Sequence, residues 1–451
     1  MQTPSPYKSF SARLCEEFLE EATFLLEQLS ARRNDPELRW LDAEEDEARL
    51  EAHLDGLVVC ADAAVEVCVT HLHADDPAEL QAALRALCRL GCRLEVLNAT
   101  ESLDPGDPQK LAAAAAALSA EAPKAWHDDL AEIALRHPPL AAAVAPALAR
   151  DGRAAEPRLL ALLAAADETS APPVLEALGR VGGNASVDAV TAHVASESPA
   201  TATAAAVAAW RLGADIERPL LRAVGTRPWL IVPAALGCGR AAVAAVTERL
   251  ADDDARGEAL LALGLLGDLS SVRALYQALS DATHAQTAAL ALSIVTGAPL
   301  LAETFVPDPV DPDALFDDER AHWEQTGEAP LRSDGTPFGT TEIRLSTDPG
   351  AWRAWLSAHK SRFDPSRRYR YGLPYSPASL LRTVEAERVP PRVRAFACDE
   401  LKTRYGCGFP LSVEMPVTEQ RRLIARLHEW VDEKGRAFEP GEWYRSARRL
   451  S

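Results

Sequence analysis

Residues 258–267 read EALLALGLLG, and this stretch decides the fold that the sequence predicts. It is built from Ala and Leu, which favour helices because Ala has the highest helix propensity and Leu loses little rotamer freedom in a helix. Gly264 and Gly267 stand at its end. Glycine just past a helix supplies the left-handed residue that satisfies loose carbonyl groups. The stretch therefore predicts a helix and its end.

Similar helix endings recur through the middle of the chain. They are Ala177-Leu178-Gly179, Trp210-Arg211-Leu212-Gly213, Ala235-Leu236-Gly237, Ala262-Leu263-Gly264 and Ser293-Ile294-Val295-Thr296-Gly297. Each unit has room for two short helices, such as residues 271–279 and 282–296. Two short helices bury little apolar surface alone, so several units must lean on one another. The pattern predicts an all-α chain in which helix pairs stack into an α-solenoid.

The rest of the chain divides around these repeats. We expect an N-terminal helical region at 1–150, the repeats at 151–300, an acidic proline-rich linker or loop at 301–348, and a helical C-terminal module at 349–451. In the first region, Asp76-Pro77 and Asp107-Pro108 predict helix starts, because Asp can cap a helix and Pro is tolerated at its first position. Residues 308–330 are expected to be an acidic linker or a partly helical excursion, and a short strand is expected at 342–345. Helices of the module are expected at 349–360, 377–387, 391–405, 417–433 and 440–449.

Charge is distributed unevenly. The net charge is −20, which opposes nucleic-acid binding because that binding depends on neutralising phosphates. Residues 352–451 contain 20 Lys plus Arg and 12 Asp plus Glu, a net of +8, so the remainder carries −28. We expect this basic segment to dock partly on the acidic remainder. The first residues lack the apolar run of a signal peptide, no apolar run is long enough for a membrane span, and the eight Cys have no framework spacing. These features predict a cytoplasmic protein.

Two resemblances concern the family. The helix endings at 154–298 resemble HEAT-like repeats of the phycobilin-lyase type, which implies a right-handed α-solenoid and no particular activity. The segments Glu20-Glu21-Ala22-Thr23-Phe24-Leu25, Leu50-Glu51-Ala52-His53-Leu54-Asp55-Gly56-Leu57 and Arg368-Tyr369-Arg370-Tyr371-Gly372-Leu373-Pro374 are similar to an uncharacterised bacterial HEAT-repeat family. Its members tend to be encoded near type VI secretion genes. This resemblance implies an accessory role as an adaptor, effector chaperone or immunity protein.

A group of Cys and His residues in the N-terminal region could bind a metal. Cys88 and Cys92 are four residues apart and share one helix face, and an antiparallel hairpin would bring Cys60 near Cys88. With His71 they form a set of zinc-type ligands. The alternative is that the cysteines are small buried apolar residues, which is usual for free Cys. We expect no metal and no cofactor.

The C-terminal module contains a run of basic and aromatic residues, a combination enriched at protein interfaces. Its candidate partner-binding residues are Trp352, Trp355, Arg367, Arg368, Tyr369, Arg370 and Tyr371. The run could bind a partner or the acidic repeats of the same chain. Alternatively, it is a structural turn whose aromatic side chains pack the core of the module.

These features together predict a protein-binding scaffold rather than an enzyme. The chain has no Gly-rich phosphate loop and no Gly-x-Ser-x-Gly motif. The expected partner is another protein, and the second resemblance implies a secretion effector or toxin. The alternative is a metal-dependent or lyase-type enzyme built on HEAT-like repeats.

Overall fold

The computed structural model describes residues 6–34, 39–312 and 315–450, and the fold is all-α with a few short strands, as predicted. The first half contains α1 (Pro6–Asn34), α2 (Glu44–Cys60), α3 (Asp62–His71), α4 (Pro77–Leu90), α5 (Arg93–Glu101), α6 (Pro108–Glu121), α7 (His127–Arg136), α8 (Ala141–Leu148) and α9 (Glu156–Ala165). Next come α10 (Ala171–Val181), α11 (Asn184–Ala192), α12 (Pro199–Arg211), α13 (Glu217–Ala223), α14 (Ile231–Gly237), α15 (Ala242–Glu248), α16 (Asp253–Leu266), α17 (Val272–Ala278) and α18 (Ala285–Thr296).

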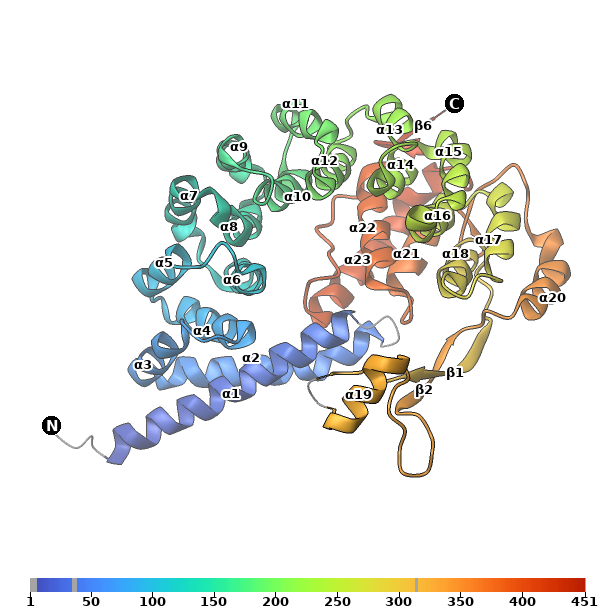
Figure 1. Ribbon diagram of the computed structural model, residues 1–451. Coiled ribbons are helices and arrows are strands. Elements are labelled where there is room, and N and C mark those ends of the chain that lie inside the picture. The colour runs from blue at the N-terminus through green and yellow to red at the C-terminus, as the bar shows by residue number, and fades with distance from the viewer. Residues whose placement is uncertain (1–5, 35–38, 313–314, 451) are drawn as a thin grey trace.

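These helices form a curved double row (Figure 1). The even-numbered helices from α4 to α18 pack on one another in succession along the inner side, and the odd-numbered helices from α3 to α17 cover them outside. We call α3 to α18 the helical stack. One apolar core runs through it and includes Leu84, Val144 and Leu263. The row continues without a break across residue 150, where we expected the repeats to begin.

Local sequence sets the helix ends. Asp76 caps α4 by accepting a hydrogen bond from the Ala78 N–H at 2.8 Å, and Asp107 caps α6 in the same way. Gly267 and Gly297 end α16 and α18 in the left-handed conformation. Gly264, by contrast, lies inside α16. A Cβ atom there would be 2.9 Å from the Ala291 Cα of α18, so this glycine allows two inner helices to pack closely.

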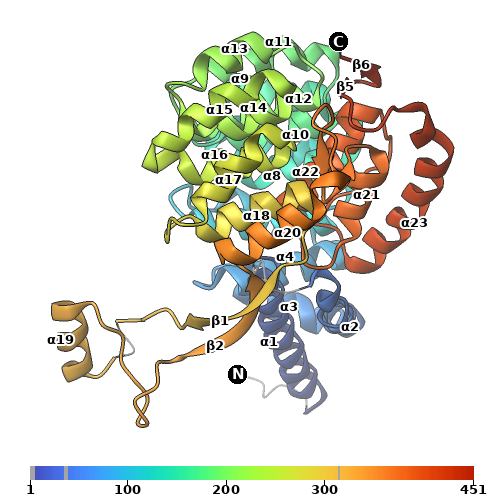
Figure 2. The same ribbon diagram turned by 90° about the vertical axis from the view of Figure 1, so that its right-hand side faces the viewer.

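Residues 301–312 and 315–345 project from the stack (Figure 2). Strand β1 (Leu301–Pro307) pairs antiparallel with β2 (Gly339–Leu345), and helix α19 (Asp317–Thr326) lies between them in the sequence. We call residues 301–345 the arm. The strand expected at 342–345 is present and begins earlier, at Gly339. Its partner β1 was missed, because the prolines that follow it favour an irregular linker.

The C-terminal module begins with α20 (Pro349–His359) and continues through strands β3 (Tyr369–Arg370) and β4 (Leu373–Pro374). It then contains α21 (Pro377–Glu385), α22 (Pro391–Tyr405), α23 (Val417–Lys434), β5 (Tyr444–Arg445) and β6 (Arg448–Arg449). The helix expected at 440–449 is wrong, since β5 and β6 form a hairpin there. Ser446 and Ala447 have φ values of 48° and 62°, which an α-helix does not permit. Among the described residues, none of the helices combines the length and apolar character needed to span a bilayer.

Candidate functional site

The C-terminal module lies against the C-terminal ends of the inner helices. The last carbonyl groups of a helix have no partner within it, and the helix dipole makes this end partly negative. Seven donors of the module reach these ends. They are Lys402 to Arg180 O (2.9 Å), Arg404 to Leu236 O (2.9 Å), Arg445 to Gly237 O (3.1 Å), Arg370 to Leu265 O (3.0 Å), Tyr369 N to Gly267 O (2.8 Å), Tyr371 N to Ile294 O (2.6 Å) and Gly372 N to Val295 O (3.1 Å).

Ion pairs accompany these hydrogen bonds. The Arg211 side chain at the end of α12 pairs with Asp399 at 2.6 Å, and Arg392 pairs with Glu258 at 2.7 Å. The basic module therefore docks on the acidic stack, as its charge predicts, although the stack supplies the arginine in the Arg211–Asp399 pair. The helix endings that repeat along the sequence are the surface on which it docks.

A charged cluster is buried where the module meets the stack. Glu400 accepts from Arg370 and from Arg404, both at 2.8 Å, and from the Tyr375 hydroxyl. Burial acts to raise the pKa of Glu400, but the charges of Arg370 and Arg404 outweigh it and lower that pKa. The Arg368 guanidinium lies between the rings of Tyr375 and Trp443, 3.3 and 3.5 Å from their centroids.

Burial lowers the pKa of Arg368 to about 10. Its three side-chain nitrogens are buried without a hydrogen-bond partner, so its contacts are with the two aromatic faces. Because Glu400 is one carboxylate among three arginines, the cluster keeps a net positive charge next to the negative helix ends.

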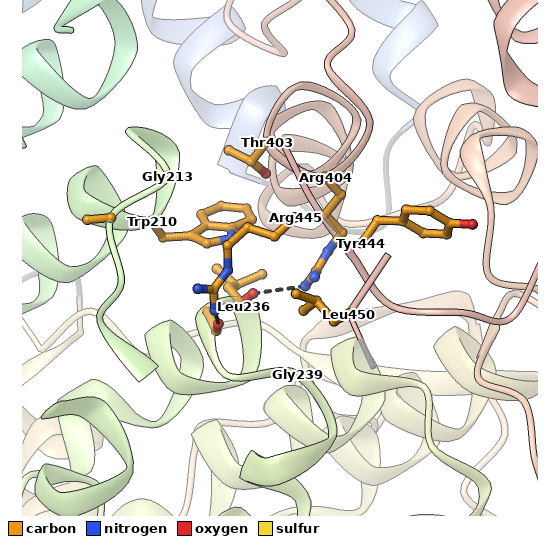
Figure 3. Close-up of a pocket in the computed structure, with 11 residues that line it drawn as sticks. Trp210, Gly213, Leu236, Gly239, Thr403, Arg404, Tyr444, Arg445 and Leu450 are labelled. Atoms are coloured by element: carbon orange, nitrogen blue, oxygen red, sulfur yellow. Dashed lines mark hydrogen bonds between the residues drawn. The ribbon is translucent and has the colours of Figure 1, made fainter. Parts of the chain in front are cut away.

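A small cavity lies beside this cluster (Figure 3). Trp210 and Leu236 of the stack and Arg404, Tyr444 and Arg445 of the module line it. In the close-up, Arg404 and Arg445 point to backbone oxygens at the end of α14. The cavity volume is about 10 Å³, the space that one water molecule needs. This seam thus holds two parts of the chain together and has no room for a substrate.

The structure places most of the predicted partner-binding residues inside the chain. Trp352, Arg368, Tyr369 and Arg370 are buried, and the Trp352 indole N–H donates to Ser346 O at 2.6 Å. An outside partner cannot reach these four side chains while the module is docked, which corrects the expectation of an open binding surface. The alternative we kept, docking on the repeats of the same chain, describes their contacts.

The remaining three candidates are nearer the surface. The Trp355 ring stacks on His359 with centroids 4.2 Å apart. Arg367 is half-buried and donates to Pro440 O at 3.1 Å. Tyr371 is half-buried and has a φ of 46°, held by its backbone bond to Ile294. Their contacts, too, are with this chain.

The Cys and His candidates do not assemble into a ligand set. Among the residues that the structure describes, no group of three or more His, Cys, Asp or Glu side chains could hold a metal ion. His71 contacts Glu79 and lies 3.0 Å from Glu16. Cys88 is buried, and burial raises the pKa of its thiol to about 12. Cys60 lies beside Cys15 of α1, and Cys92 is half-buried with a raised pKa.

The module also contacts the N-terminal part of the chain, which the sequence does not indicate. Arg421 pairs with Glu44 at 3.0 Å, and the Val417 N–H donates to Glu47 at 2.7 Å. The Arg394 guanidinium lies 4.1 Å from the ring centroid of Trp40. The module thus bridges α2 and the far helices of the curved stack (Figure 1). Glu400 and Arg404, four residues apart on α22, were the available sequence signal for the buried cluster.

No family model, curated protein or solved structure matches this chain.

Proposed function

We propose that this chain is a non-catalytic scaffold that binds another protein. The location of its exposed large apolar side chains supports this proposal. Of the thirteen that are exposed among the described residues, six lie in the arm, which is 45 residues of 451. They are Leu301, Phe305, Phe316, Leu331, Phe338 and Ile343. Exposed apolar side chains gathered on one element mark interaction sites.

The use of the charged residues supports the same proposal. Arg370, Arg404 and Glu400 are engaged in contacts within the chain, between the module and the stack and inside the module. Their cavity holds about one water molecule. This seam therefore lacks the pocket with convergent polar groups that catalysis needs, whereas an exposed arm suits binding.

The resemblance described above extends the proposal to a partner class. It implies that the partner belongs to a type VI secretion system, as an effector, a toxin or a spike component, and that the chain acts as adaptor, chaperone or immunity protein. A HEAT-like solenoid is the fold that the resemblance implies for the stack.

Affinity purification of the full chain from its native host tests the proposal. We expect one protein to co-purify in near-stoichiometric amount and to bind again when both are purified separately. A chain that recovers no such partner, or that holds stoichiometric zinc or iron by elemental analysis, would overturn it. The identity of the recovered protein tests the secretion role.

A further inference from the structure

Building on the proposed function, we infer that one face of the arm ribbon is the docking strip, and that its partner presents apolar side chains flanked by Lys and Arg. The pairing of β1 with β2 determines which residues form the strip. Leu301 pairs with Leu345, Glu303 with Ile343, and Phe305 with Thr341. Cross-strand partners share a face, and so do residues two apart on one strand. Leu301, Phe305, Ile343 and Leu345 therefore lie on one face, with Glu303 as the charged residue among them.

The other face of the ribbon is different in character. It carries Ala302, Thr304, Val306, Thr340, Glu342 and Arg344. Glu342 and Arg344 pair with each other at 2.9 Å along β2. The ribbon is thus amphipathic, with a polar face and an apolar face. The apolar residues Leu301, Phe305 and Ile343 are exposed, whereas most residues of the polar face are half-buried, which is the reverse of what water alone favours.

The body of the chain covers this face only at Leu345, which packs against the core of the stack, and leaves the other three apolar residues exposed. Leu301, Ile343 and Phe305 are 52%, 50% and 45% exposed. Figure 2 shows the arm extending away from the stack. A two-stranded ribbon alone is at best marginally stable in water. The Phe305 ring lies over Gly339, where a Cβ atom would be 2.6 Å from its Cζ, so the two strands pack closely at this point.

The charge of the arm indicates which kind of partner would bind the docking strip. Residues 301–345 contain eleven Asp plus Glu and three Arg, a net of −8. A partner with basic residues beside its apolar strip complements this field, and charge complementarity speeds and orients association. A second copy of the chain is disfavoured, because each copy carries −20 and many arginines of the basic module are engaged within the chain.

Three full-length variants separate the contribution of the apolar strip to binding from that of the acidic charge. The strip variant is Leu301→Thr, Phe305→Thr, Ile343→Thr. The charge variant is Asp317→Asn, Asp318→Asn, Glu324→Gln, which leaves the strip intact. The matched control removes exposed apolar side chains from the body, with Val59→Thr, Leu94→Thr, Leu135→Thr; these residues are 84%, 63% and 44% exposed. Circular dichroism and thermal melting verify that each variant keeps the wild-type body.

The probe is a short fluorescein-labelled peptide of alternating Leu and Lys, compared with its Leu/Glu counterpart by fluorescence anisotropy. We expect wild type to bind the Leu/Lys peptide and not the Leu/Glu peptide. The strip variant should lose about tenfold or more in affinity. The charge variant should also bind more weakly and with less dependence on salt, whereas the control should bind as wild type does.

Several results would overturn the inference. One is a strip variant that binds the Leu/Lys peptide as well as the control does. Another is sedimentation showing that wild type self-associates and the strip variant does not, which would make a second copy the occupant. If the host partner is captured equally by wild type and the strip variant, the scaffold function stands and the arm is not its docking site. If wild type captures no host partner, the function itself fails.

Discussion

The guanidinium of Arg370 lies 2.8 Å from the carboxylate of Glu400, and the two side chains are 0% and 1% exposed. The same guanidinium donates to Leu265 O at the end of α16. This pair therefore joins three elements, β3, α22 and the stack. Because Glu400 also receives Arg404, it is the carboxylate on which the buried charges of the seam depend.

Replacing Glu400 should destabilise the protein strongly. In Glu400→Gln the buried arginines lose their negative partner, and breaking a buried ion pair by removing one member costs about 3–5 kcal/mol. The free energy of unfolding in urea measures the effect. Glu258→Gln is the control, since its pair with Arg392 is exposed on both sides and such pairs contribute about 0–1 kcal/mol. Equal losses in the two variants would contradict a special role for the buried cluster.

Gly267 should tolerate a side chain less well than Gly91. Both glycines are left-handed, with φ of 70° and 76°, so Ala strains the backbone at both by about 1–2 kcal/mol. A Cβ atom on Gly267 would lie 2.1 Å from Tyr369 O of the module, whereas one on Gly91 meets nothing within 4 Å. Thermal melting of Gly267→Ala and Gly91→Ala should give the lower Tm for Gly267→Ala. Matching melting temperatures would mean that the module is not seated tightly on this helix end.

A chain that ends after Leu300 should be less stable and more prone to aggregate than the full chain. Removing the module frees the carbonyl groups of Leu236, Leu265 and Gly267 and exposes the apolar inner surface beneath it. Thermal melting and light scattering on both chains measure the difference. If the shortened chain proved as heat-stable and as monodisperse as the full one, docking of the module would be unimportant for stability.

His71 should make stability depend on pH. Burial disfavours its charged ring, but hydrogen bonds and charge from Glu79 and Glu16 outweigh burial and raise the pKa of His71 above its usual value of 6.5. A raised pKa in the folded state stabilises the fold below pH 6.5, and this stabilisation is lost as pH rises through the folded-state pKa. Urea unfolding at about pH 6 and about pH 9 should show the loss in wild type.

His71→Gln is the control for that measurement. It should unfold with a smaller difference between the two pH values, because Gln does not titrate. NMR titration of the imidazole gives the pKa directly. A value for His71 at or below 6.5 would contradict the expected direction.

The buried thiols should resist modification in the folded protein. Burial raises the pKa of Cys15, Cys68, Cys88 and Cys238 to about 12, so little thiolate forms at neutral pH. Labelling with a maleimide near pH 7, followed by peptide mass spectrometry, should leave these four unmodified until a denaturant is added. Rapid labelling of Cys88 in the native state would contradict the burial on which this expectation rests.

Local sequence specifies most of the helices and many of their limits, although not at 440–449 or at Gly264. Helix propensity, capping by Asp76 and Asp107, and the helix-ending Gly267 act within a few residues, so a local pattern is enough to specify them. Helix α22 begins and ends where it was expected, at 391–405. The opposite charges of the module and the remainder likewise indicated that the two would meet. What each helix end contacts depends on tertiary packing.

The repeated helix ends become a docking surface because the curvature of the stack aligns carbonyl groups that are far apart in the sequence. Arg370 reaches Leu265, 105 residues away, and Arg404 reaches Leu236, 168 residues away. Docking of the module also buries Arg368 and Tyr369. The local sequence alone predicts that these side chains could be exposed to a partner. Strand β1 also depends on a contact that is distant in the sequence. Its backbone groups form hydrogen bonds only when β2 pairs with it.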